Sequence, residues 1–216
     1  MDFAGAYSWV NIRFLLQGFG VTLLVAFCAI VLSLVLGCAL AVIRYARLPL
    51  LSRVTAIWVD TMRNLPLLLI IFFSYFALPQ VGLKMNVFVA AVVALTVFES
   101  AMISEIIRAG LVSIEKGQIE AARSSGLGFG QTLRYIILPQ ALRRMVPPIV
   151  SQCISLLKDT SLTVIIALPE LMNHAQIING ADIHYVVPIF IMAALLYFSV
   201  NYAISLASRR WELKNV

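Results

Sequence analysis

Uncharged apolar stretches of helix length constrain this chain more than any other feature. The two clearest are Val21–Ile43 and Val186–Ala207, which contain no Asp, Glu, Lys or Arg. A helix that crosses a bilayer needs about 20 consecutive, mostly apolar residues. The whole chain is 62% hydrophobic and only 12% charged, whereas soluble domains average about 25% charged residues. The sequence therefore predicts an integral membrane protein.

Three further stretches have the same length but contain charges, namely 56–78, 87–107 and 146–168. All five stretches are mostly apolar and of helix length, whereas the strands of a membrane barrel are about 10 residues long and alternate in polarity. Backbone groups in lipid must be satisfied within each segment, which favours helices. We therefore expect an all-α transmembrane fold with five spanning helices in one domain.

The positions of the basic residues predict the orientation of these helices. Most of the 16 Lys and Arg residues follow the first stretch, follow the third stretch or lie in the C-terminal tail. The opposite side carries only Arg13 and Lys84. Because Lys and Arg are enriched in cytoplasmic loops, we expect the N-terminus outside and the C-terminus in the cytoplasm. This asymmetry accounts for the basic composition without nucleic acid. Arg44, Arg47 and Arg53 are the basic residues after the first stretch.

The expected organisation follows from these assignments. Residues 1–17 form an extracellular N-terminal segment, residues 18–209 form the transmembrane domain and residues 210–216 form a cytoplasmic tail. A long cytoplasmic loop, residues 108–145, lies inside the domain and is too patterned to be disordered. Within it we expect a helix over 114–125 and a second helix over 131–137 that ends near Pro139. Pro147 and Pro148 should then mark the start of the fourth spanning helix.

Glycines separate the two loop helices and superficially suggest a phosphate loop. Gly126, Gly128 and Gly130 alternate with other residues. A phosphate-binding P-loop, however, needs Lys and Ser or Thr after its last glycine. Gln131 and Thr132 stand there instead, and helices flank the turn. We interpret the glycines as a helix-breaking turn and find no nucleotide site in the chain.

A specific motif crosses this turn. Glu120-Ala121-Ala122 is followed at fixed spacing by Gly126 and then by Leu138-Pro139. This pattern resembles the EAA signature of bacterial ATP-binding cassette (ABC) importer permeases. Its flanks, including Met62-Arg-Asn-Leu-Pro66 and Leu157-Lys-Asp-Thr-Ser-Leu162, are similar to the polar amino-acid branch of that family. The resemblance extends from about residue 18 to the C-terminus.

The resemblance implies a fold, a function and partners. The fold would be the five-helix type I importer (MetI-like) bundle in a bacterial inner membrane. The EAA loop would be a coupling helix that docks on a cytoplasmic ATPase, and that separate subunit would bind the ATP, so this chain needs no cofactor. An extracellular or periplasmic amino-acid-binding protein would deliver the substrate, and a second permease subunit, identical or paralogous, would complete the pathway. The residues that take the coupling positions by match are Glu120, Ala121, Ala122, Gly126, Leu138 and Pro139.

Physical chemistry is consistent with docking, although the loop pattern alone also fits an amphipathic helix on the membrane surface. Small residues at 121 and 122 would allow a helix to approach a partner closely. Glu120 could pair with a partner arginine, and Gly126 would let the chain turn away.

Charged residues inside the predicted spans need partners or a cavity. Asp60 and Arg63 are three residues apart, as are Glu105 and Arg108, so each pair shares a helix face and can form an ion pair. Glu99 lies in the middle of the third span without a nearby cation in sequence. It should face the bundle interior, either protonated, paired across helices or lining the substrate pathway.

The fourth stretch carries a polar stripe. Helical spacing places Gln152, Ser155 and Asp159 on one face together with Thr163, and Thr160 and Ser161 follow directly. Such a stripe suits a pathway lining, but the same residue types also form helix–helix hydrogen bonds. The candidate substrate-pathway residues are Gln152, Ser155, Asp159, Thr160, Ser161 and Glu99.

The stripe indicates a class of substrate. A cationic amino acid would favour two or more carboxylates, but Gln152 supplies an amide beside Asp159. An amide and hydroxyls suit a neutral polar side chain such as glutamine, and Lys158 would tolerate glutamate. An ion-coupled transporter or channel using Glu99 and Asp159 is an alternative that would not require the EAA loop. An intramembrane enzyme is disfavoured because His174 and His184 form no metal or nucleophile spacing.

Overall fold

The structure is a computed structural model, which describes residues 1–46 and 48–215, with side chains placed through Arg210. Within those ranges every regular element is helical. Four helical segments are long and apolar enough to cross a membrane, and a bent pair of helices would make a fifth span. The all-helical prediction is confirmed. Arg47 and Lys214, counted above for orientation, lie outside the described side chains.

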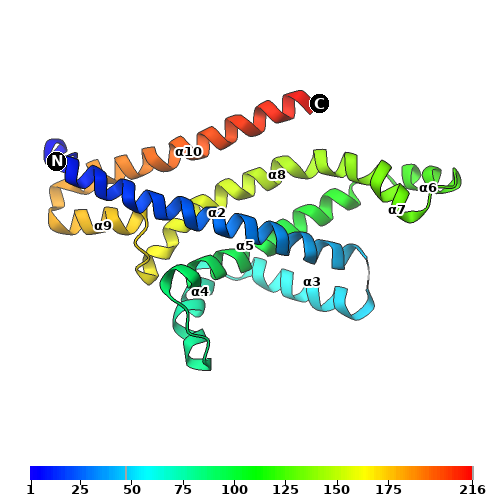
Figure 1. The fold of residues 1–216 in the computed structure, drawn as a ribbon, viewed down its shortest axis with the longest axis horizontal. Coiled ribbons are helices and arrows are strands. Elements are labelled where there is room, and N and C mark those ends of the chain that lie inside the picture. Colours follow the sequence, from blue (N-terminus) through cyan, green and yellow to red (C-terminus); the bar gives the residue numbers. More distant parts are fainter. Residues whose placement is uncertain (47, 216) are drawn as a thin grey trace.

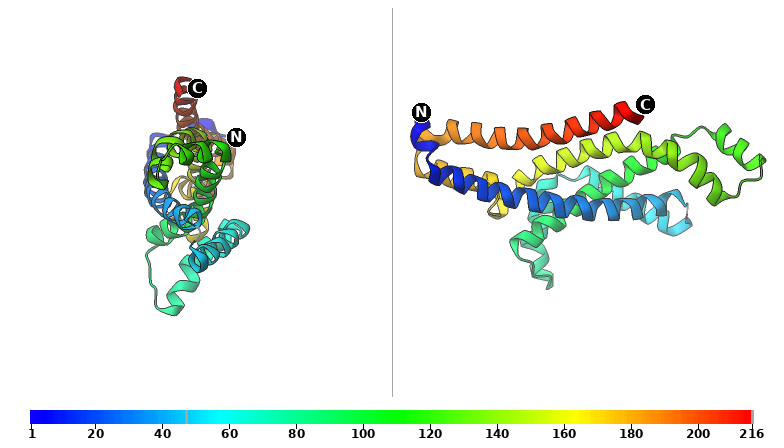
Figure 2. Two further views of the ribbon diagram at one scale, coloured as in Figure 1. Left: turned by 90° about the vertical axis from the view of Figure 1, so that its right-hand side faces the viewer. Right: turned by 45° about the horizontal axis from the view of Figure 1, so that its top comes forward.

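The long helices run roughly side by side in an elongated bundle (Figure 1). Its main members are α2 (Trp9–Tyr45), α5 (Val87–Val112), α8 (Leu138–Asp159) and α10 (Val186–Asn215). The N-terminal helix α1 (Phe3–Ala6) and α9 (Leu171–Ala181) lie at one end. The short helices α6 (Lys116–Ser124) and α7 (Phe129–Thr132) project from the opposite end, as Figure 1 and the right-hand view of Figure 2 show.

Apolar packing holds the bundle together at three levels along its length. The central cluster joins α2, α5 and α8, with Val25, Leu95 and Leu156 almost fully buried. A second cluster, near the α6 end, centres on Ile103 and Ile137. The third cluster ties α9 and α10 to the start of α2 at the opposite end. Small residues allow close helix contact, because a Cβ on Gly37 would stand 2.7 Å from the Ile103 side chain.

The second span differs from the continuous helix expected over 56–78. Helix α3 (Pro49–Asn64) ends before Pro66, and α4 (Leu67–Phe72) restarts at an angle of 105°. Pro66 disfavours helical backbone in the residue before it, and Leu65 is extended, with φ −87° and ψ 143°. The chain then continues through a π-helical turn, η1 (Phe73–Ala77), and a 3₁₀ turn, η2 (Leu78–Val81).

The fourth span is longer than expected. A continuous helical segment extends over residues 129–166, through the π-helical turn η3 (Leu133–Ile137), α8 and the 3₁₀ turn η4 (Thr160–Ile166). The expected end at Pro139 and the expected start at Pro147 are therefore wrong. Pro139 lies in the first turn of α8, where a missing N–H is tolerated, and Pro147 and Pro148 lie inside that helix. Packing from α5 and α10 supports α8 there.

Two remaining elements join the last spans. Ala167 has a left-handed backbone (φ 56°) that ends η4 and lets the chain turn back into α9. A 3₁₀ turn, η5 (Ile183–Tyr185), leads into α10. Helix α9 was not expected from the sequence. Its length of 11 residues is too short for a span.

Candidate functional site

A buried carboxylate and an amide meet between the third and fourth spans. Glu99 of α5 is only 1% exposed, and Gln152 Nε2 of α8 donates to its Oε2 at 3.3 Å. The second carboxylate oxygen of Glu99, Oε1, is buried without a hydrogen-bond partner in the described residues. Such a group in a native fold calls for an explanation. Glu99 thus faces the bundle interior as expected, and the interhelical partner is an amide rather than a cation.

The rest of the polar stripe on α8 divides into two groups. Ser155 and Asp159 are half-buried and share the Gln152 face. Thr160 is fully buried, and its hydroxyl donates to the Leu157 carbonyl at 2.7 Å. The Ser161 hydroxyl donates to the Lys158 carbonyl at 2.7 Å. The polar atoms of Ser155 and Asp159 are therefore available to a partner or ligand. The hydroxyls of Thr160 and Ser161 instead donate to backbone carbonyls where α8 meets η4.

Ser161 also borders a cavity of about 450 Å³ between α4, η4 and α9. Leu68, Leu162 and Met172 contribute apolar walls, and Gln176 adds an amide. The structure brings Glu99 and Gln152 into contact but does not gather all six candidate pathway residues into one closed pocket. Within the described residues, no group of three His, Cys, Asp or Glu side chains is placed to hold a metal ion.

The signature motif lies on α6 and the turn that follows it. Glu120 and Ala121 are exposed, whereas Ala122 is only 7% exposed and faces inward. Gly126 has φ +87°, and its N–H donates to the Arg123 carbonyl at 3.0 Å, while the Leu127 N–H donates to the Ala122 carbonyl. These hydrogen bonds form a helix C-cap in which a glycine adopts the left-handed conformation. The exposed face of α6 therefore carries the charge of Glu120, and the turn needs glycine at 126.

Side chains near the start of α8 contact α6 and the end of α5. Arg144 donates through Nη1 to the Ser113 carbonyl at 2.6 Å. Gln140 donates to Gln118 Oε1 at 2.8 Å. Both donors follow the Leu138-Pro139 part of the signature, which opens α8. Gln140 thus links α6 to the start of α8, and Arg144 links the end of α5 to the same helix.

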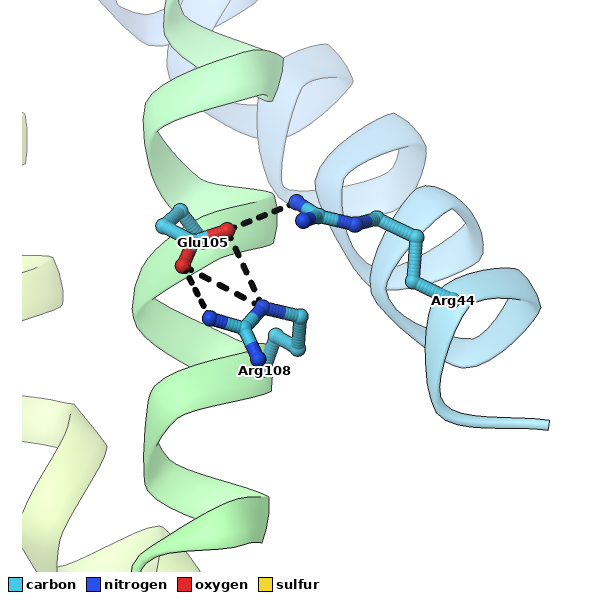
Figure 3. A network of polar contacts seen from close by, with 3 residues as sticks. All are labelled: Arg44, Glu105 and Arg108. Atoms are coloured by element: carbon cyan, nitrogen blue, oxygen red, sulfur yellow. Dashed lines mark hydrogen bonds and ion pairs between the residues drawn. The ribbon is translucent and has the colours of Figure 1, made fainter. Parts of the chain in front are cut away.

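An ion cluster ties α2 to α5 at the same end of the bundle (Figure 3). Glu105 accepts from Arg44 Nη1 at 2.6 Å and also pairs with Arg108. The expected Glu105–Arg108 pair is therefore confirmed, with a second arginine that sequence spacing could not reveal. The expected pair of Asp60 with Arg63 is wrong, because among the described residues no ion pair joins these two side chains. Both are exposed, and exposed ion pairs gain little free energy.

A second buried carboxylate, Glu170, was missed by the sequence analysis. It is fully buried and begins α9, where it accepts from the backbone N–H groups of Met172 and Asn173 at 2.9 and 2.8 Å. Thr22 of α2 and Tyr197 of α10 donate to the same carboxylate at 3.3 and 3.2 Å. A helix-capping acid could have been noticed from its place before α9, but its contacts with distant helices could not.

Both histidines have structural partners. His174 stacks on Phe14, and its Nδ1 lies 2.6 Å from the Phe14 carbonyl oxygen. His184 is exposed, and its Nδ1 lies 2.8 Å from Asp182 Oδ1. The His184 backbone N–H, followed by its ring, holds the pKa of the Asp182 carboxyl below its usual value.

Comparisons with known proteins match this architecture. The family described as "Binding-protein-dependent transport system inner membrane component" matches residues 33–212. The "probable glutamine ABC transporter permease protein GlnP" of Bacillus subtilis (strain 168) is 64% identical over 216 residues, with 99% of each chain covered. The "probable glutamine ABC transporter permease protein GlnM" of the same organism is 40% identical, covering 91% of this chain and 90% of GlnM. A crystal structure of an amino acid ABC transporter with histidines superposes with a TM-score of 0.92 at 29% identity, covering 99% of each chain.

The chain therefore belongs to the family of binding-protein-dependent transport system inner membrane components. Within that family it is the permease subunit of an ABC importer of the polar amino-acid branch, which confirms the resemblance carried by the EAA motif. It is a multi-pass protein of a bacterial inner membrane and a transport subunit rather than an enzyme. Permeases of this kind function with an ATPase and a binding protein.

Proposed function

We propose that this permease carries glutamine and that the Glu99–Gln152 pair helps to select it. Two relatives bear names that specify glutamine, and one of them is 64% identical to this chain. The site offers an amide at Gln152, with half-buried Ser155 and Asp159 on the same face of α8. A neutral amide side chain can both donate to and accept from such groups. The unpartnered oxygen of Glu99 is the observation that carries this proposal.

We propose a division of roles within the pathway. Glu99 and Asp159 attract the substrate amino group, and the exposed Lys158 tolerates a carboxylate. Gln152 and Ser155 bind the side-chain amide, and Thr160 and Ser161 shape the end of α8. Because one chain leaves Ser155 and Asp159 partly exposed, the pathway is closed by a second permease subunit, identical or paralogous, across a pseudo-two-fold axis.

The exposed face of α6 docks on the ATPase subunit in this proposal. Glu120 pairs with a basic residue of the ATPase, and Ala121 allows close approach. Ala122, Leu138 and Pro139 hold the segment on the bundle, and Gly126 turns the chain out of the docking site. The loop between α5 and α8 then faces the cytoplasm, whereas the N-terminus and α9 face the binding protein outside. Basic residues at the α6 end support this orientation.

Substrate selection is tested by Gln152→Glu. Glu at 152 would stand beside Glu99, and the extra negative charge should favour cationic substrates. Competition for uptake of labelled glutamine should show arginine gaining about tenfold relative to glutamine. Gln80→Glu, an exposed change on η2, is the matched control and should leave the competition unchanged. Wild-type protein in which arginine competes better than glutamine would contradict the assignment.

A further inference from the structure

A cavity of about 480 Å³ opens at the ends of α2 and α5, beside the start of α7. It is separate from the Glu99–Gln152 pair and from the exposed face of α6. Polar and apolar side chains both contribute to its wall. The lining residues are Arg44, Tyr45, Ala46, Arg108, Val112 and Phe129.

Two guanidinium groups in this wall share one carboxylate. Glu105 accepts from both Arg44 and Arg108, and the three side chains are 21%, 13% and 34% exposed, respectively. Arg44 donates only through Nη1, so within the described part of the chain its Nε and Nη2 have no acceptor. Asp60 balances part of the charge on Arg108 from α3, but it does not line the cavity. The cavity therefore presents unused, directed N–H donors.

The surroundings indicate what these donors bind. Arg44 directly follows the uncharged stretch that ends at Ile43, so its guanidinium lies at the boundary between hydrocarbon and water. Val112 and Phe129 are 59% and 63% exposed at the rim of the cavity. A free anion in water gains nothing from an apolar rim, whereas a lipid presents a phosphate beside apolar chains. Basic pockets between spanning helices are suited to lipid headgroups.

We infer that this cavity binds the phosphate diester headgroup of an anionic phospholipid from the leaflet at the α6 end of the bundle. Arg44 and Arg108 bind the phosphate oxygens with their forked donors, and Phe129 and Val112 contact the glycerol and upper acyl chain. In the proposed orientation, this leaflet is the cytoplasmic one. Because Phe129 begins α7, directly after the signature turn, a bound lipid also contacts the segment that joins α6 to the bundle.

The test is lipid retention by the purified transporter complex in nanodiscs of phosphatidylglycerol and phosphatidylcholine, counted by native mass spectrometry. Arg44→Gln and Arg108→Gln should each lower phosphatidylglycerol retention by about fivefold. Arg53→Gln, which removes an exposed charge from α3, is the matched control and should not. Phe129→Ser should weaken retention without changing any charge.

Glu105→Gln separates binding from a structural role of the cluster. Removing the competing carboxylate should raise phosphatidylglycerol retention. If the cluster only holds α2 and α5 together, the substitution should weaken that contact and should not raise retention. Equal retention in wild type and both arginine variants would overturn the inference. Displacement of the lipid by millimolar inorganic phosphate would also overturn it. So would arginine variants that lose the ATPase while their phosphatidylglycerol retention is unchanged. Glutamine uptake, measured in parallel, distinguishes failure of this inference from failure of the proposed transport function.

Discussion

Gly126 is the glycine of the EAA motif, and its backbone conformation forms the turn that follows α6. Its φ of +87° is disfavoured for residues with a Cβ, although a Cβ at this position would meet no neighbouring atom. The requirement for glycine therefore comes from the backbone and not from crowding. The sequence could indicate a turn here, because glycines interrupt a helical pattern, but it could not show that only Gly126 of the three glycines in this turn adopts a positive φ.

A substitution at this position should change coupling more than folding. Gly126→Ala costs about 1–2 kcal/mol of local backbone free energy, which should reorient the end of α6 and lower uptake while the protein remains in the membrane. Gly117→Ala, inside α6 with open space around its Cβ position, is the control and should leave uptake intact. Equal uptake by Gly126→Ala and wild type, measured at equal membrane abundance, would show that the turn conformation is not needed.

At the scale of elements, the five apolar stretches were predictable from length and composition, but the course of the second and fourth was not. Pro66 breaks its span because Leu65 takes the extended backbone that precedes proline, whereas Pro147 and Pro148 remain helical where neighbouring helices support α8. The Glu99–Gln152 contact links positions 53 residues apart in the chain, so sequence could place each residue on an inward face but could not pair them. Contacts between helices are set by packing that no single segment encodes.

The Glu170 cluster offers a test of how α9 is held. Glu170→Gln replaces an acceptor oxygen with an amide donor, so at least one of its buried donors loses its partner, at a cost of about 1–3 kcal/mol. The midpoint of thermal denaturation in detergent should fall for Glu170→Gln and also for Thr22→Ala. Glu115→Gln, an exposed change, should leave the midpoint unchanged. A Glu170→Gln protein as heat-stable as wild type would contradict the assignment of this carboxylate as the link between α2, α9 and α10.

For the whole molecule, the two ends of the bundle differ in a way that fits separate partners. One end carries α1 and α9, and the other carries α6 and α7. Asp182 follows α9 directly with its side chain 40% exposed, and Glu115 precedes α6 and is exposed. The proposed orientation predicts that a membrane-impermeant maleimide labels intact cells at Asp182→Cys but not at Glu115→Cys. Cys28, Cys38 and Cys153 are replaced by alanine beforehand. Labelling of Glu115→Cys from outside would reverse the orientation.

We propose that the ATPase attaches through the exposed face of α6, because movement of the ATPase has to reach the spanning helices for uptake to occur. The most direct measurement is co-purification of the ATPase with Glu120→Lys, made beside Glu115→Lys, which reverses a neighbouring exposed charge in the same loop. This attachment predicts that Glu120→Lys loses ATPase co-purification and glutamine uptake by about tenfold or more, while Glu115→Lys keeps both. Undiminished attachment and uptake in Glu120→Lys would contradict it.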